Sequence, residues 1–104
     1  MRIFVLLLAL VLLPSVARAD YFDGNSLKQL MDSQRPQDVG IYRGYIAGVQ
    51  DDHNWVLFCV HPDVRLNQAA AIVSKYFSVN PQLWHLPAKQ LVIDALSQSF
   101  PCRK

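Results

Sequence analysis

The chain has 104 residues, of which 52% are hydrophobic, and a formal net charge of +2. This composition excludes intrinsic disorder, which requires low hydrophobicity together with high net charge. The length suits one small domain and is too short for two domains of ordinary size.

The N-terminal segment has the pattern of an export signal. Arg2 precedes an unbroken apolar run over residues 3–13, which is followed by Pro14 and by the small-residue sequence Ala17-Arg18-Ala19. This order predicts a secretory signal peptide over residues 1–19. The apolar run would span about 16 Å as a helix, well short of a ~30 Å hydrocarbon core, so we do not expect a membrane anchor.

We expect the mature chain, residues 20–104, to form a single domain. Its eight basic residues balance its eight aspartates once Arg2 and Arg18 leave with the signal peptide. A neutral chain has no electrostatic attraction to nucleic acid or to an anionic membrane, so we expect neither as a partner.

The two cysteines, Cys59 and Cys102, form an even set in a chain that we expect to enter an oxidising compartment. We therefore predict a disulfide bond between them. The chain-entropy model assigns such a cross-link roughly 4 kcal/mol, which is large beside a total stability of about 5 kcal/mol for a small domain.

Helical periodicity predicts an all-α fold, a compact bundle of about four helices. The first helix follows capping residues in segment 23–26, carries Leu27, Leu30 and Met31, and stops near Pro36. The second covers about residues 37–50, and we expect it to be central and packed on both sides. Its apolar stripe consists of Tyr42, Tyr45, Ile46 and Val49, its other face carries Gly40, Gly44 and Gly48, and Gly44, Tyr45 and Gly48 form its packing motif.

Residues 51–55 break the helical pattern and predict an exposed turn, although burial in the core is the favoured interpretation for Trp55. Residues 56–60 form an apolar run that we expect to be extended, and residues 61–63 turn the chain again.

The third and fourth helices have the clearest amphipathic patterns. The third is expected to bury Leu66, Ala69, Ala70, Val73, Tyr76 and Phe77. A connection then leads to Pro87, a good first-turn residue for the fourth helix. This helix is expected to bury Ala88, Leu91, Val92, Ala95 and Leu96, with Ile93 on its polar side.

No arrangement of residues indicates catalysis, a metal or a cofactor. His53, His61 and His85 fall in three separate loops, without the i, i+4 spacing of a helical pair of metal ligands. Cys59 and His61 could form a nucleophile and its base, but a reactive thiol is reduced and partly exposed, whereas Cys59 lies in an apolar run with Cys102 available. We expect a protein that is not an enzyme.

The connection between the third and fourth helices carries large apolar side chains. Leu83 and Trp84 lie there beside His85, and such residues in a protruding loop are typical of a protein-binding hot spot. For Trp84 this interpretation and burial in the core are equally supported. Ile93 would extend this surface or support self-association. Taken together, the residue patterns predict an exported helical module that binds protein.

Five sequence blocks, in order, resemble those of the Rap/Tai-type immunity proteins, and the resemblance covers about residues 25–102. The blocks are Gly44-Tyr45-Ile46-Ala47-Gly48-Val49, Phe58-Cys59-Val60-His61-Pro62, Asn80-Pro81, Leu86-Pro87-Ala88, and Ala95-Leu96 followed by Ser99-Phe100-Pro101-Cys102. Members commonly have a second cysteine pair, at positions where this chain has Met31 and Tyr42.

The resemblance implies a small, helical, often dimeric periplasmic protein. It would bind a cognate peptidoglycan amidase effector of the type VI secretion system and inhibit it by occluding the active site. The expected effector contacts are Asn80, Gln82, Leu83, Trp84 and His85. The alternative function is a small periplasmic acid-stress chaperone, which the motifs and the lack of a lysine-rich composition disfavour.

Overall fold

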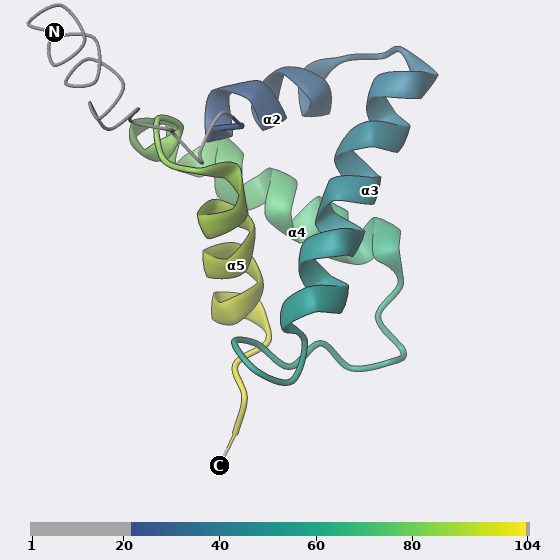
Figure 1. Cartoon of the computed structure of the whole chain (residues 1–104), viewed down its shortest axis with the longest axis vertical. Helices are drawn as coiled ribbons and strands as arrows, with labels where there is room; N and C mark the ends of the chain where they lie inside the picture. Colours follow the sequence, from purple (N-terminus) through teal and green to yellow (C-terminus); the bar gives the residue numbers. More distant parts are fainter. Residues whose placement is uncertain (1–21, 104) are drawn as a thin grey trace, which may run out of the picture.

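The computed structural model describes residues 22–103, which fold into four α-helices and one short 3-10 helix, with no strand in this range (Figure 1). The elements are α2 (Gly24–Asp32), α3 (Pro36–His53), α4 (Leu66–Val79), η1 (Pro81–Leu83) and α5 (Ala88–Ser99). The predicted all-α fold is confirmed, and the predicted signal peptide lies outside the described residues. None of the helices between residues 22 and 103 is long and apolar enough to cross a membrane.

The start of α2 is fixed by its cap and by the chain that precedes α5. The Asp23 carboxylate accepts a hydrogen bond from the Ser26 backbone N–H at 2.9 Å, which satisfies a helix N-terminal donor as predicted. The backbone N–H groups of Gly24 and Asn25 donate to the carbonyls of Leu86 and Trp84, each at 2.9 Å. These bonds attach α2 to the segment between η1 and α5.

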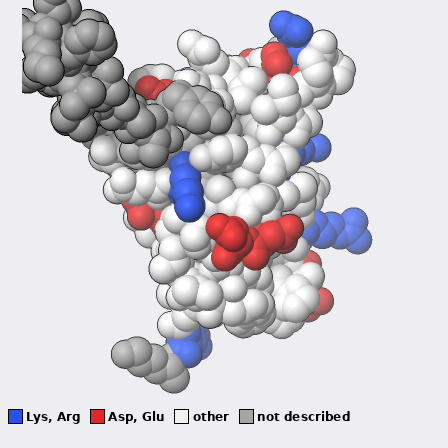
Figure 2. Space-filling model, viewed as in Figure 1, with Lys and Arg blue, Asp and Glu red and all other residues white. Residues whose placement is uncertain are grey.

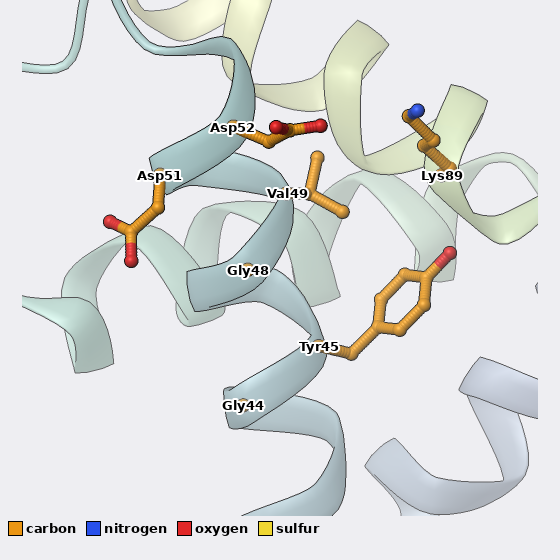
Figure 3. Close-up of a pocket in the computed structure, with 7 residues that line it drawn as sticks. All are labelled: Gly44, Tyr45, Gly48, Val49, Asp51, Asp52 and Lys89. Carbon is orange, nitrogen blue, oxygen red and sulfur yellow. The ribbon is translucent and has the colours of Figure 1, made fainter.

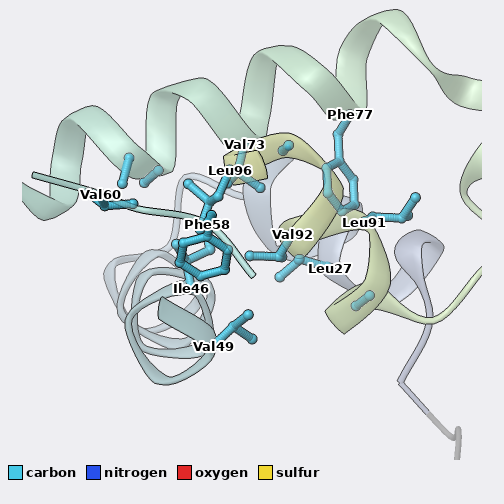
Figure 4. Packing of buried hydrophobic residues seen from close by; sticks show 14 residues of the cluster. Leu27, Ile46, Val49, Phe58, Val60, Val73, Phe77, Leu91, Val92 and Leu96 are labelled. Atoms are coloured by element: carbon cyan, nitrogen blue, oxygen red, sulfur yellow. The ribbon is translucent and has the colours of Figure 1, made fainter. Parts of the chain in front are cut away.

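The core is formed by side chains from every α-helix and from the segment between α3 and α4 (Figure 4). In Figure 1, α3 and α5 descend side by side in front of α4, and α2 lies across the top. The predicted buried residues of α5 are all buried, whereas Leu66 at the start of α4 is 39% exposed, contrary to prediction. Ile93 is partly buried against the core rather than on a polar face.

Helix α3 is packed on one face only, so the prediction of packing on both faces is wrong within this chain. Its buried residues are Ile46 and Val49. A Cβ atom added at Gly40, Gly44 or Gly48 would meet no atom within 4 Å, and the neighbouring Ile41 is 54% exposed. The glycine face is therefore an open surface of the molecule.

The chain after α3 differs from its predicted course. The helix continues to His53 instead of ending near residue 50, and a tight turn over residues 54–58 follows. Phe58 and Val60 are buried, and the predicted disulfide bond joins Cys59 to Cys102. Trp55 is 62% exposed, so its predicted burial in the core is wrong.

Candidate functional site

The predicted effector-binding segment, residues 80–85, forms η1 and the first part of the connection to α5. Gln82 and His85 are exposed, and Leu83 is partly buried against the core. The Asn80 side chain donates to the Tyr76 carbonyl at 2.9 Å and accepts from the Gln82 side chain at 3.1 Å. The segment is thus bonded to the end of α4, and it presents two polar side chains to solvent.

Trp84 has a structural role in this segment. Its indole N–H donates to the Phe77 carbonyl at 2.8 Å, and the Lys28 ammonium lies 5.4 Å from the ring centroid. Its carbonyl accepts the bond from α2 described above. Trp84 therefore links α2, α4 and the connection to α5, and it is partly buried.

An open groove of about 500 Å³ lies between α3 and α5 (Figure 3). Gly44 and Gly48 form its smooth wall on α3, and Tyr45 extends from the same helix towards α5. The Tyr45 ring also packs against Phe22, with the ring centroids 5.0 Å apart. The packing motif predicted from Gly44, Tyr45 and Gly48 therefore lines a surface groove.

The groove has charged groups at one end. Lys89 lines it from α5, and Asp51 and Asp52 lie in the last turn of α3. The Asp52 carboxylate extends across the groove towards α5, whereas the Asp51 carboxylate points to the other side of α3 (Figure 3). Acidic side chains are grouped on this face of the molecule (Figure 2). The C-terminal end of a helix carries a partial negative charge, and these two carboxylates add to it. A cationic group of a partner would therefore be favoured here.

A second, smaller groove of about 320 Å³ lies between α4 and α5 and is lined in part by Tyr76, Val79 and Ala95. Burial raises the pKa of Tyr76, and the nearby Asp94 carboxylate adds to this effect. Tyrosine is neutral at physiological pH without any such shift, so Tyr76 offers this groove a phenol that can donate or accept a hydrogen bond.

The turn after α3 presents a third surface, which the sequence reading missed. Trp55, Val56 and Leu57 are 62%, 74% and 48% exposed. The run of apolar residues indicated burial, and only Phe58 and Val60 at its end are buried. The polar stretch before the run did predict an exposed turn, but residues 51–53 continue α3, and the exposed side chains belong to the apolar residues that follow.

The histidines and cysteines do not form a site. His53 is the last residue of α3 rather than part of a loop, His61 and His85 lie in separate connections, and Cys59 is bonded to Cys102. Within residues 22–103, no three histidine, cysteine or acidic side chains are grouped as a metal site would require.

The fold and these surfaces define a small helical domain with one disulfide bond. The family of Rap1a immunity proteins matches residues 23–102, a range that includes all the described helices and both cysteines. The chain belongs to the Rap1a immunity protein family. A comparison with curated proteins found no match.

Family membership confirms the resemblance that the sequence motifs indicated. It implies an immunity protein that binds a cognate effector, and such proteins are typically not enzymes. The family and the disulfide bond together indicate an exported protein.

Proposed function

We propose that the protein acts in the periplasm, where it binds a peptidoglycan amidase effector of the type VI secretion system and inhibits it by occluding the active site. The observation that carries this proposal is the family match over residues 23–102. An inhibitor of a wall-cleaving enzyme must reach the wall, and a disulfide bond persists in that oxidising compartment.

Segment 80–85 is one candidate for the effector contact. Its exposed side chains, Gln82 and His85, are available to a partner, whereas Trp84 and Leu83 also pack within the chain. If the effector binds this segment, Gln82 and His85 would make the contacts, and Leu83 and Trp84 would hold the backbone in place.

A homodimer is also part of the proposed assembly. The open face of α3 combines three glycines with the exposed Ile41, and a helix surface without side chains allows a second helix to approach closely. Sedimentation equilibrium of the oxidised mature protein tests this assembly. A monomer at all micromolar concentrations would contradict it.

The function is tested by capture of candidate effectors. The oxidised protein, residues 20–104, is immobilised and offered purified amidase effectors encoded in its own genome. We expect one amidase to bind with nanomolar affinity and to lose its peptidoglycan-cleaving activity in the complex. If no amidase is retained and the protein instead suppresses client aggregation near pH 2–3, the immunity function is wrong and a chaperone function replaces it.

A further inference from the structure

We propose that the turn formed by Trp55, Val56 and Leu57, named here the apolar turn, is a preorganised contact that inserts into a concave apolar site of the bound effector. This inference rests on the proposed function and deepens it, because it assigns the contact to a part of the chain other than segment 80–85. The turn lies below α3 and α5, beside the C-terminal segment (Figure 1).

Exposure is the first argument. A single exposed apolar side chain is ordinary, but three in succession, one of them a tryptophan, place a large exposed apolar area on one short turn. Tryptophan is the residue most typical of binding hot spots, because it buries a large rigid area with little loss of conformational entropy.

The backbone of the apolar turn is already ordered in the free protein. The Trp55 N–H donates to the Phe58 carbonyl at 2.7 Å, and the Val56 and Leu57 N–H groups both donate to the His53 carbonyl at 3.1 Å. The Ser97 hydroxyl, from α5, lies 3.1 Å from the Leu57 carbonyl oxygen and 2.6 Å from the Ile93 carbonyl oxygen, and its single proton is donated to one of them at a time. The N–H groups of Trp55, Val56 and Leu57 therefore all have backbone partners within the chain.

Anchors on both sides hold the turn against the core. The Asn54 side chain accepts from the Val60 N–H at 2.8 Å and donates to the Val60 carbonyl at 3.3 Å. Phe58 and Val60 are 0% and 1% exposed, and the disulfide bond fixes Cys59 between them. A loop held in this way loses little conformational entropy on binding, which favours affinity.

Backbone strain at Trp55 supports a role for its side chain. Its φ is +71°, in the left-handed region that glycine and asparagine adopt at much lower cost than a bulky residue. Because the indole is exposed, its packing within the chain offsets little of the free-energy cost of this backbone conformation. Strained residues that the surrounding structure holds in place are concentrated at binding sites.

The shape and charge of the surface indicate the kind of partner. A projecting turn requires a concave partner surface, and the exposed Asp51 and Asp52 next to it disfavour an anionic membrane. We expect basic residues on the rim of the partner site, on the side that faces α3. Insertion into a groove of a second copy would join two different surface patches, which produces rings or open chains unless the two copies insert reciprocally.

Trp55→Asn tests this inference, because asparagine tolerates the left-handed backbone while removing the apolar side chain. The probe is the amidase that the wild-type protein retains in the capture experiment. We expect the Kd of Trp55→Asn to rise about thirtyfold, with a thermal midpoint equal to or above that of the wild type. Leu66→Asn, which removes an exposed apolar side chain at the start of α4 and lies in none of the proposed contact surfaces, is the matched control and is expected to retain affinity.

The outcomes separate the inference from the proposed function. If the wild type binds an amidase and Trp55→Asn binds it equally well, the apolar turn is not the contact, and the immunity function is unaffected. If the wild type retains no amidase, both are overturned. If the wild-type protein forms larger particles as its concentration rises and Trp55→Asn does not, the apolar turn contacts a second copy of this chain rather than the effector. Amide exchange at Trp55 and Leu57 as fast as in an unstructured peptide would overturn preorganisation.

Discussion

Gly24 and Gly44 are both helical glycines, yet their surroundings predict opposite effects of the same substitution. A Cβ at Gly24 would lie 2.7 Å from the Trp84 carbonyl oxygen and 2.9 Å from its Cα, which are backbone atoms. A Cβ at Gly44 would meet open space. We expect Gly24→Ala to destabilise the protein by about 1–3 kcal/mol through overpacking, and Gly44→Ala to stabilise it by about 1 kcal/mol through helix propensity.

Urea unfolding of the two variants and the wild type measures both changes under one condition. The comparison is matched, because each variant adds one methyl group to a helix. Equal stability of the two variants would contradict the close packing of α2 against the segment before α5.

The two tryptophans show why burial of a single residue is hard to predict from sequence. Both lie outside regular helical patterns, and both carry the same large apolar group. Trp84 is partly buried because its indole N–H reaches the Phe77 carbonyl, whereas Trp55 is exposed because its turn projects beyond the ends of α3 and α5. Each outcome depends on contacts with distant parts of the chain, which periodicity does not describe.

At the scale of single elements, the N-cap of α2 makes stability depend on pH. The Ser26 backbone N–H, hydrogen-bonded to the Asp23 carboxylate, lowers the pKa of Asp23 below its ordinary value of 3.8. The folded state therefore favours the carboxylate. Its contribution to stability is fully present above pH 3.8 and is lost as the pH falls through the lowered, folded-state pKa.

Asp23→Asn separates this effect from general acid unfolding, because asparagine remains a good N-cap but does not titrate. We expect the difference in unfolding free energy between wild type and variant to be constant from about pH 7 to pH 5 and to shift in favour of the variant below about pH 4. Denaturant unfolding at a series of pH values measures this difference. Parallel curves down to pH 2 would show that Asp23 does not titrate with folding.

Helix periodicity predicted most elements because the core-facing residues of α4 and α5 repeat at helical spacing. The end of α3 was missed because Asp51, Asp52 and His53 carry no apolar signal, although they continue the helix. The open glycine face was missed for a related reason, since close helix contact and an empty surface have the same sequence pattern. The unoccupied side of α3 emerges only from the arrangement of all the helices.

At the scale of the whole molecule, the disulfide bond connects the two segments that leave the helices at one end of the fold. Cys59 follows the apolar turn, and Cys102 follows α5, whose C-cap carbonyl at Phe100 accepts from the Cys59 N–H at 2.8 Å. The opposite end of the bundle is held instead by backbone bonds from Gly24 and Asn25 and by the Trp84 indole. Loss of the disulfide bond should therefore destabilise the end of the fold that contains the apolar turn more than the opposite end.

We expect Cys59→Ser/Cys102→Ser to lower the unfolding free energy by up to roughly 4 kcal/mol, the value for closing a loop of this length. Before global unfolding, amide exchange should accelerate most in residues 55–60 and least around Leu91, which is buried at the other end of α5. Because the apolar turn would lose one of its anchors, affinity for the amidase should fall as well. Hydrogen exchange followed by mass spectrometry resolves the two regions, and uniform acceleration would mean that the disulfide stabilises the bundle as a whole and does not specifically hold the turn.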